Sequence, residues 1–262
     1  MALPKPSGDF EWVQESWGAA LRCVPLAAVA PHCFSTRDLS LEGVPDDDHA
    51  GWQALAVSLG LRSEALVRLR QVHGAGIYDA TSESASPANA EEWPEADVAI
   101  TRDPSFALTV RTADCVPILL ADSRTGAVAA VHAGWKGTAA GAVIASVRAL
   151  EWKYGTGPAD IVAAVGPSIG ACCYEVGGEL AAGFTHHPDA PRWFAQGLAK
   201  PRLNLWRATH DQLERAGVPT RQIHVCELCT ADYPELFHSY RRDGSGAGRL
   251  VAAVRSSPGK RL

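Results

Sequence analysis

Short apolar runs separated by turn residues dominate the middle of the chain. Residues 106–110, 116–121 and 127–132 are each rich in Val, Leu, Ile or Ala, and a Gly-containing turn separates the last two. We therefore predict three strands here, the last two of which form a hairpin. Two further apolar runs, at residues 160–165 and 222–226, predict two more strands.

Other segments carry apolar residues at helical spacing. Residues 51–61 and 204–216 each predict an amphipathic helix, and the Ala-rich stretch 138–152 predicts a third. Thr138 is the expected N-cap of that third helix. The loop Gly134–Gly137 would then lead directly into a helix N-terminus, which is a favourable place for an anion.

Strands and helices interleave along the chain without a regular doubly wound pattern. We therefore predict an α+β fold, with mixed, sandwich-like β-sheets flanked by helices. The chain shows no internal repeat and no clear linker, so a single domain over residues 1–262 is expected. Residues 1–12 predict a loose N-terminal tail, and the polar stretch 81–92 predicts an exposed loop.

Composition and charge exclude several classes of function. The chain has 24 Lys and Arg against 29 Asp and Glu, a net charge of −5, and no long basic cluster, which argues against nucleic-acid binding. No apolar run is long enough to span a bilayer, and the N-terminal residues lack a signal peptide's apolar segment, so we expect no membrane association and a cytoplasmic location. The seven cysteines are therefore expected to be reduced thiols.

Three separate segments carry candidate metal ligands. His73 would end a strand over residues 68–73, while Cys115 and His132 lie at the two ends of the predicted hairpin that become neighbours if its arms pair antiparallel. Two neutral imidazoles and one thiolate suit a tetrahedral Zn²⁺ ion with a vacant fourth position. From the residues alone, however, His73 could be a structural histidine and Cys115 a small buried apolar side chain.

Other cysteines have simpler interpretations. Cys226 and Cys229 form a CxxC pair, but no second CxxC accompanies it and its first cysteine ends a strand rather than opening a helix. A thioredoxin-like or zinc-ribbon site is therefore not indicated. Cys172 and Cys173 are adjacent, cannot easily chelate one ion, and are interpreted as packing or pocket-lining residues.

The candidate ligands lie within motifs that resemble a known family. His73-Gly, Thr112-Ala-Asp-Cys115 and His132-Ala-Gly-Trp-Lys-Gly-Thr138, in this order, resemble the YfiH-type family, also called multicopper polyphenol oxidase-like, purine nucleoside phosphorylase-like or peptidoglycan editing factor. The matches extend over nearly the whole chain. The other motifs that carry the resemblance are Phe34–Arg37, Ile161–Ile169, Tyr174–Val176, Cys229–Asp232, Phe237–Gly244 and Gly248–Arg249.

The resemblance implies a zinc-dependent enzyme that cleaves purine nucleosides with phosphate. It also implies adenosine deaminase and methylthioadenosine phosphorylase activities and a part in peptidoglycan precursor editing, by a monomer or homodimer. His73, Cys115 and His132 would hold the ion, which lowers the pKa of bound water, and would form the catalytic centre. Asp114 would orient a ligand imidazole or accept a proton, although it could instead cap backbone amides in a turn.

Two cationic side chains are candidates for binding phosphate. Arg37 offers a guanidinium fork suited to phosphate oxygens, and Lys136 lies in the loop after His132. The simpler alternatives are a salt bridge for Arg37 and a solvated loop position for Lys136. The segment Asp38–Asp48 departs from the Gly-Gly-Val-Ser-like stretch that is usual in the family, so the role of Arg37 depends on a divergent pocket wall.

Three other classes of function compete with the nucleoside phosphorylase. Two imidazoles and a thiolate also suit copper, which would make the chain a laccase-like polyphenol oxidase. A four-copper oxidase, however, needs many more histidines than this site provides, and Met1 is the only methionine. Cys115 could instead be the nucleophile of a thiol hydrolase, with His132 or His73 as its base. The last class is a metal-binding protein without catalytic activity.

Overall fold

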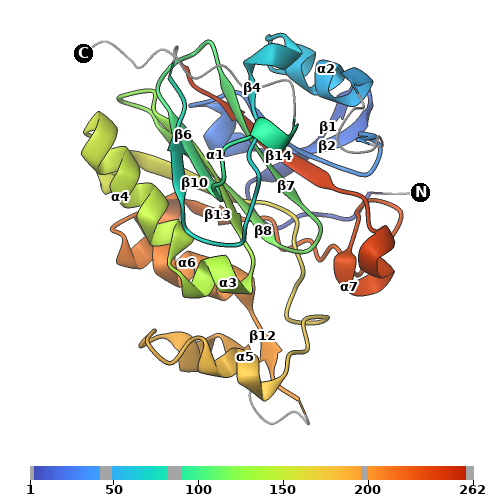
Figure 1. Ribbon diagram of the computed structural model, residues 1–262, viewed down its shortest axis with the longest axis vertical. Coiled ribbons are helices and arrows are strands. Elements are labelled where there is room, and N and C mark those ends of the chain that lie inside the picture. Colours follow the sequence, from blue (N-terminus) through green and yellow to red (C-terminus); the bar gives the residue numbers. More distant parts are fainter. Residues whose placement is uncertain (1–2, 42–48, 82–89, 196–199, 258–262) are drawn as a thin grey trace.

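Two six-stranded sheets form the centre of the molecule. The computed structural model describes residues 3–41, 49–81, 90–195 and 200–257 (Figure 1). The first sheet has the strand order β1-β2-β3-β14-β7-β4 and the second the order β13-β10-β8-β9-β6-β5, while β11 and β12 form a small third sheet. Both large sheets are mixed, because each contains parallel and antiparallel pairs. The predicted α+β fold is therefore confirmed.

The strands are distributed along the whole chain. Those of the first sheet are β1 (Phe10–Glu15), β2 (Gly18–Cys23), β3 (His32–Ser35), β4 (Leu66–Val67), β7 (Ala107–Thr112) and β14 (Leu250–Arg255). Those of the second sheet are β5 (Ile77–Asp79), β6 (Val98–Thr101), β8 (Val116–Asp122), β9 (Val128–Ala133), β10 (Ile161–Val165) and β13 (Ile223–Val225). The small sheet contains β11 (Phe194–Ala195) and β12 (Arg202–Leu203).

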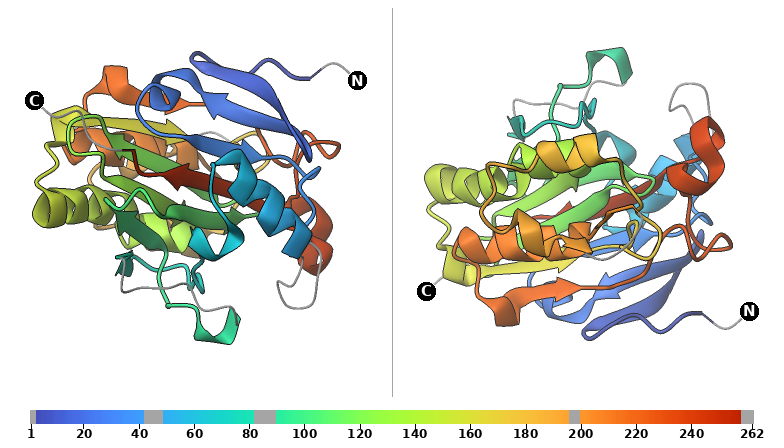
Figure 2. Two further views of the ribbon diagram at one scale, coloured as in Figure 1. Left: turned by 90° about the horizontal axis from the view of Figure 1, so that it is seen from above. Right: turned by 90° about the horizontal axis from the view of Figure 1, so that it is seen from below.

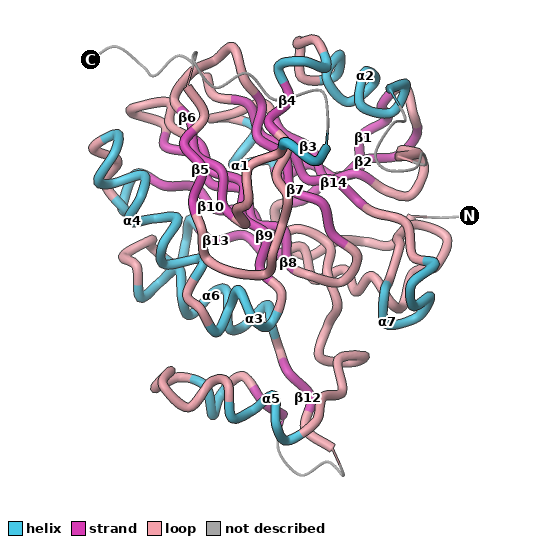
Figure 3. The backbone as a smooth tube through the Cα atoms, viewed as in Figure 1, coloured by secondary structure: helices cyan, strands magenta, loops and turns pink. Residues whose placement is uncertain are grey.

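Helices α4 and α6 cover the outer face of the second sheet, and α2 covers that of the first (Figure 2). In chain order they are α1 (Val24–Ala27), α2 (His49–Ser58), α3 (Trp135–Ala139), α4 (Ala142–Tyr154), α5 (Gly178–Ala182), α6 (Leu205–Arg215) and α7 (Tyr240–Asp243). The segment with α5 and β12 lies at the lower end of the molecule in Figures 1 and 3.

Three apolar cores hold the layers together. The core between the sheets contains Phe34 and Leu108 from the first sheet and Leu119 from the second. A second core packs α4 and α6 on the other face of the second sheet, and a third packs α2 on the outer face of the first. Burial on both faces explains why β8 and β9 are apolar along their whole length rather than alternating with polar residues.

The predicted hairpin is confirmed and brings two candidate ligands together. Strands β8 and β9 pair antiparallel, with Val116 opposite Ala133 and Pro117 opposite His132. Cys115 directly precedes β8, so the register places it at the end of the hairpin that holds His132. The strands predicted around residues 107, 161 and 223 are also present, as β7, β10 and β13.

The predicted helix over residues 138–152 is interrupted in the structure. Gly141 adopts a left-handed conformation with φ of 77°, which ends α3 and starts α4. Thr138 consequently lies inside α3, and the N-cap positions belong to Gly134 and Gly141. The expectation that Thr138 caps one long helix was therefore wrong, because a short Ala-rich run gave no sign of the left-handed glycine.

Two other segments differ from the sequence prediction. Strand β4 ends at Val67, and His73 lies in a loop with φ of 62° rather than at the end of a strand. At the N-terminus, β1 begins at Phe10, within the segment expected to be a loose tail. Residues 42–48 of the divergent segment and residues 82–89 of the predicted polar loop lie outside the described residues.

In the parts of the chain that the structure describes, no helix combines the length and the apolar character needed to cross a membrane. The longest helix, α4, spans 13 residues and packs one side against the second sheet. A helix needs about 20 mainly apolar residues to cross a bilayer, so this agrees with the absence of a spanning run in the sequence.

Candidate metal centre and adjoining cavity

His73, Cys115 and His132 converge at the end of the β8–β9 hairpin. One potential ligand atom from each lies within 4.8 Å of those from the other two. The two imidazole rings meet edge to face, with centroids 4.8 Å apart and planes at 78°. His132 is buried in β9, Cys115 is half-buried before β8, and His73 is exposed. This arrangement is compatible with three ligands that leave one side of a metal ion open.

Asp97, which the sequence analysis did not single out, organises the histidines. Its carboxylate is fully buried and accepts a 2.8 Å hydrogen bond from Nδ1 of His132. It also accepts the backbone N–H groups of His73 and Gly74 at 2.9 and 2.6 Å. Because Nδ1 of His132 donates to Asp97, Nε2 is the nitrogen left to bind a metal ion. Asp97 therefore sets the ring orientation of His132 and holds the loop of His73.

The electrostatic environment favours a thiolate at Cys115. Burial by itself would raise the pKa of this thiol, but hydrogen bonds and charge from His132 and His73 outweigh it and lower the pKa to about 6. The effect on His132 is reciprocal. Burial would lower its pKa, while Asp97 and Cys115 raise it to about 9. A thiolate is the form that binds metal ions and the form that acts as a nucleophile.

Gly134 allows the three ligands to approach one another closely. A Cβ atom at this position would lie 2.7 Å from Sγ of Cys115 and 3.4 Å from Cδ2 of His73. Such a contact with the sulfur is too short, so any larger residue would push Cys115 out of place. Gly134 is also the N-cap of α3, so the glycine of the His-Ala-Gly motif is required by packing at this centre.

Asp114 does not contact a ligand imidazole in the structure. It has φ of 88°, and its carboxylate accepts hydrogen bonds of 2.6 Å from the Thr230 hydroxyl and from the backbone N–H of Arg241. The bond to a backbone amide fits the capping role considered from the sequence, and the role of Asp114 as a proton acceptor stays a prediction. The position next to Cys115 nevertheless places it in the wall of the cavity described below.

A cavity of about 920 Å³ opens beside the three ligands. Its lining contains both basic and apolar or aromatic side chains. The carboxylate of Asp114 and the candidate metal ligands complete the wall. The basic residues are Arg70, Arg111, Arg241 and Arg249, and the apolar and aromatic ones include Trp135, Ile169, Tyr174, Leu205 and Tyr240. A cavity of this size and mixed lining is typical of a small-molecule site.

The two cations proposed from the sequence as phosphate ligands lie outside this lining. The exposed Arg37 donates to the backbone carbonyl of Pro234. The exposed Lys136 lies with Nζ 5.7 Å from the ring centroid of Trp135. Among the described residues that surround the cavity, the guanidinium groups are instead those of Arg70, Arg111, Arg241 and Arg249. Arg241 and Arg249 lie in motifs that carry the family resemblance, but no sequence signal assigned any of the four to phosphate.

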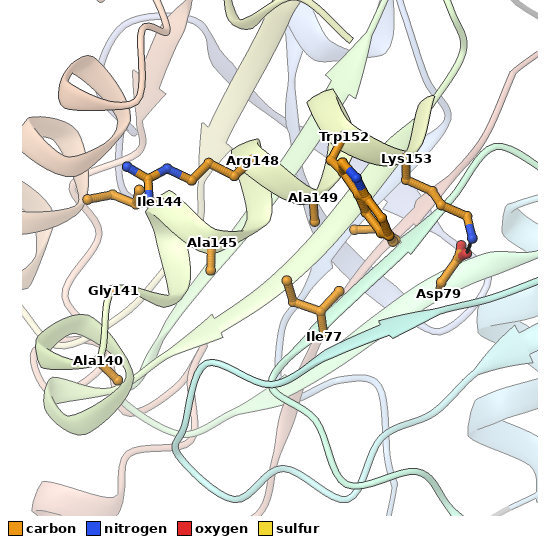
Figure 4. Close-up of a pocket in the computed structure, with 11 residues that line it drawn as sticks. Ile77, Asp79, Ala140, Gly141, Ile144, Ala145, Arg148, Ala149, Trp152 and Lys153 are labelled. Carbon is orange, nitrogen blue, oxygen red and sulfur yellow. Dashed lines mark ion pairs between the residues drawn. The ribbon is translucent and has the colours of Figure 1, made fainter. Parts of the chain in front are cut away.

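A second cavity of about 700 Å³ lies beside α4 and β5 (Figure 4). Its lining is mostly apolar and includes Ile77, Ile144 and the exposed ring of Trp152. The charged groups Lys153 and Asp79 pair with each other at 2.8 Å at one end. This cavity holds none of the cysteines or histidines that could form a metal centre, and chemistry is therefore better supported at the first cavity.

Cys172, Cys173, Cys229 and Asp232 form a second possible metal site. A ligand atom from each lies within 4.8 Å of the others. The thiols of Cys172 and Cys173 donate to the two oxygens of Asp232 at 3.2 and 2.9 Å. The interpretation of Cys172 and Cys173 as packing or pocket-lining residues was therefore incomplete. It did not anticipate a turn that brings both thiols to the same carboxylate.

Comparison with known proteins gives consistent matches along the chain. The family model described as multi-copper polyphenol oxidoreductase laccase matches residues 31–257. A purine nucleoside phosphorylase of Streptomyces coelicolor is 40% identical over 223 residues, which is 83% of this chain and 87% of that protein. A purine nucleoside phosphorylase of Deinococcus radiodurans is 34% identical over 90% of this chain and 93% of its own length.

Solved structures show the same architecture. The crystal structure of YlmD from Geobacillus stearothermophilus superposes with a TM-score of 0.84 at 31% identity, covering 94% of this chain and 98% of that one. The structure of the hypothetical protein YfiH from Bacillus licheniformis also gives a TM-score of 0.84, at 28% identity, over 91% of this chain and 96% of that one.

Proposed function

This chain belongs to the multi-copper polyphenol oxidoreductase laccase family, the YfiH-type family that its motifs resemble, and we propose that it is a zinc-dependent purine nucleoside phosphorylase. The names of the most similar relatives support a phosphorylase rather than an oxidase. The observation that carries the proposal is the cavity beside His73, Cys115 and His132, whose lining includes both arginines and aromatic side chains, as the two substrates of phosphorolysis require.

The three candidate ligands fit a zinc ion. They supply two imidazoles and a thiol with a lowered pKa, and the Asp97 carboxylate orients one imidazole from behind. Gly134 leaves the room that Sγ of Cys115 needs. An ion bound there would supply Lewis acidity and positive charge next to the substrate cavity. These features support His73, Cys115 and His132 as the metal ligands, as expected from the sequence.

Phosphorolysis joins a phosphate oxygen to C1′ of the ribose and breaks the bond from C1′ to the purine nitrogen. The products are ribose 1-phosphate and the free base, which leaves with the bonding electron pair and takes up a proton. We assign phosphate binding to the guanidinium groups of Arg70, Arg111 and Arg249, because they line the cavity. Arg37 and Lys136 stay predictions from the sequence, since the structure places them outside the lining.

The purine base is assigned to the aromatic part of the cavity. The ring of Tyr174 forms part of the wall, and the guanidinium of Arg241 lies 5.1 Å from its centroid. Burial raises the pKa of Tyr174 to about 12, so its hydroxyl stays protonated and can donate to a ring nitrogen. Stacking on an aromatic side chain contributes about 1–3 kcal/mol per base in nucleic-acid complexes, which is a suitable magnitude for nucleoside binding.

The same site is proposed to deaminate adenosine and to cleave methylthioadenosine, as the family resemblance implies. Both substrates would present an adenine base and a ribose to the same lining residues of the cavity. The part in peptidoglycan precursor editing, the cytoplasmic location and the choice between monomer and homodimer stay predictions from the sequence.

A thiol hydrolase is the alternative that one structural observation favours. The Cys115 thiol has a pKa of about 6 and a histidine partner whose pKa is raised to about 9, which is the pattern of a thiolate–imidazolium pair. Copper-dependent phenol oxidation, which the family's description names, is the weaker alternative. The centre offers two imidazoles and one thiol, fewer histidines than a four-copper oxidase requires.

Phosphate-dependent release of hypoxanthine from inosine tests the proposal. The zinc-loaded protein should form hypoxanthine and ribose 1-phosphate in equal amounts, and omission of phosphate should stop the reaction. Arg111→Ala should raise the KM for phosphate more than Arg37→Ala does, because Arg111 lines the cavity and Arg37 does not. Hypoxanthine release without phosphate would contradict phosphorolysis. Activity that survives complete chelation, together with rapid alkylation of Cys115, would favour the hydrolase instead.

A further inference from the structure

The cluster of Cys172, Cys173, Cys229 and Asp232 contains three thiols and one carboxylate on two loops next to the cavity. We propose that these four side chains bind a structural Zn²⁺ ion, distinct from the one assigned to His73, Cys115 and His132. The proposal does not depend on the phosphorylase activity.

The set of donor atoms and their spacing suit zinc. Ligands about 2.3 Å from a tetrahedral Zn²⁺ ion are about 3.8 Å apart, whereas the four ligand atoms here lie within 4.8 Å of one another. The longest separations would therefore shorten by about 1 Å at most, while the thiol–carboxylate contacts of 3.2 and 2.9 Å would lengthen. Structural zinc sites are closed by four protein ligands, and three thiolates with one carboxylate carry the same total charge as the common four-cysteine site.

The local backbone explains how two adjacent cysteines can bind one ion. The N–H groups of Cys173 and Tyr174 both donate to the carbonyl of Gly170 at 3.0 Å, so this segment forms a single helical turn. Consecutive side chains in such a turn are separated by about 100°, whereas in an extended strand they point to opposite faces. Both thiols consequently reach the same carboxylate, that of Asp232.

The other side of the cluster is positioned by pairing between the loops. Ser168 and Cys229 form a parallel bridge, and the N–H of Gly170 donates to Sγ of Cys229 at 3.3 Å. An N–H group aimed at the sulfur stabilises a thiolate ligand. The N–H of Asp232 donates to the carbonyl of Cys229 at 3.2 Å, and this turn keeps the Asp232 side chain close to that of Cys229. The backbone thus places all four side chains before an ion binds.

Without an ion, the protonated thiols of Cys172 and Cys173 donate hydrogen bonds to the Asp232 carboxylate. Burial and the Asp232 carboxylate raise the pKa of Cys173 to about 12, and the hydrogen bonds from both thiols lower the pKa of Asp232. Binding would exchange the thiol protons for the cation and release them to solvent. A disulfide between Cys229 and either Cys172 or Cys173 is the rival explanation for the cluster, and the test must distinguish it from a zinc site.

An ion at this cluster would fix the part of the cavity wall nearest to Asp114. The turn of Cys172 and Cys173 continues into Tyr174, which lines the cavity. Cys229 precedes Thr230, whose hydroxyl donates to Asp114 at 2.6 Å. The ion would therefore add a link between two loops that already meet through hydrogen bonds and apolar packing, and its effect on the cavity would be one of positioning.

Zinc stoichiometry tests the proposal. The protein is purified without a His-tag, saturated with Zn²⁺, freed of unbound metal and analysed for zinc per chain. We expect about two ions in the wild type, and about one in the double variant Cys172→Ser/Cys173→Ser and in Cys115→Ser. Cys226→Ala is the matched control, because Cys226 belongs to the same CxxC pair but lies outside the cluster, and it should keep about two ions.

A second measurement on the wild-type protein does not depend on the folding of any variant. Cys172 and Cys173 are alkylated with iodoacetamide under reducing conditions, with and without Zn²⁺, and the labelled peptides are quantified. Zinc should slow the labelling of both residues by at least tenfold. Equal labelling in the two conditions, or a double variant with the wild-type zinc content, would overturn the proposal. Cysteines that react only after a disulfide is reduced would also overturn it.

Discussion

Two clusters of possible metal ligands lie near one cavity and differ in their ligand atoms and in their surroundings. His73, Cys115 and His132 meet at the end of a buried hairpin, with Asp97 behind them. The other cluster, centred on Asp232, is formed by two loops, and its cysteines range from exposed to buried.

The difference shows that the surroundings decide what a thiol can do. Two histidines lower the pKa of Cys115 to about 6, so it is a thiolate at neutral pH. Burial and the Asp232 carboxylate raise the pKa of Cys173 to about 12, so it stays a thiol unless a cation replaces its proton. Three ligands beside a cavity leave room for chemistry, whereas four ligands close a site.

The largest expected effect follows from removing the thiolate of the histidine cluster. Cys115→Ser should lose about 1,000-fold or more in phosphorolysis, because it deletes the only ligand that becomes anionic at neutral pH. Cys226→Ala, a buried thiol outside both clusters, serves as the control and should retain activity. Both are measured as kcat/KM with inosine and phosphate. Full activity and full zinc retention in Cys115→Ser would contradict the assigned metal centre.

Thiol reactivity should separate the two clusters by about 100-fold. In zinc-free protein at pH 7, Cys115 should react with iodoacetamide faster than Cys173, because Cys115 is mostly thiolate and Cys173 is almost entirely thiol. The rate difference is smaller than the difference in thiolate fraction, because a more acidic thiol gives a less nucleophilic thiolate. As pH falls through about 6, Cys115 becomes protonated and its labelling should slow. Peptide mapping by mass spectrometry measures both rates.

The zinc-loaded protein provides the control for this labelling experiment. A ligand thiolate is masked, so Cys115 should react slowly until a chelator removes the ion. Rapid, chelator-insensitive labelling of Cys115 in parallel with loss of activity would instead support the thiol hydrolase.

Close packing at Gly134 should be almost as important as the ligands. Gly134→Ala places a methyl group 2.7 Å from Sγ of Cys115 and must displace it. A displacement of about 1 Å at a catalytic centre can cost about 100-fold in rate. Gly178→Ala is the matched control, since a Cβ there meets no atom within 4 Å. If Gly134→Ala bound zinc and turned over inosine as well as Gly178→Ala does, the position of Cys115 would not depend on a glycine at residue 134.

The smallest of these effects is expected from the carboxylate behind the ligands. Asp97→Asn should weaken zinc binding by about 10-fold to 100-fold, because the amide replaces one acceptor oxygen by a donor next to the N–H groups of His73 and Gly74. Competition with a zinc-sensitive dye measures the affinity. Asp114→Asn is the comparison, because the Asp114 carboxylate contacts no ligand imidazole. An equal loss of zinc affinity in both variants would show that Asp97 does not specifically support the ligands.

The secondary structure was predictable where local patterns and tertiary packing agree. The hairpin of residues 116–133 combines two apolar runs with a Gly-containing turn, and its register alone places Cys115 near His132. Prediction failed where one residue's conformation decided the outcome. Gly141 with φ of 77° divides the expected helix, and His73 with φ of 62° lies in a loop, because apolar spacing carries no information on positive φ.

The candidate centre was only partly predictable for a similar reason. The ligand motifs contain the chemistry in their residue types, but Asp97 precedes β6 in a segment without any motif, and its signal was no more than an acidic residue before an apolar strand. The cavity arginines and the cluster around Asp232 are likewise scattered along the chain. Neighbours in sequence can be inferred from spacing, whereas neighbours in space depend on how the loops fold over the sheets.

By itself, the sequence determined the α+β class, the hairpin and the residue types of a zinc-compatible centre, because apolar periodicity and ligand chemistry are local properties. Only the tertiary structure decided which carboxylate supports that centre and which cations line the cavity. It also decided that the adjacent Cys172 and Cys173 lie together with Cys229 around the carboxylate of Asp232. Those outcomes depend on long-range packing of the two sheets and on turns such as the one at Gly170, which bring distant side chains within hydrogen-bonding distance.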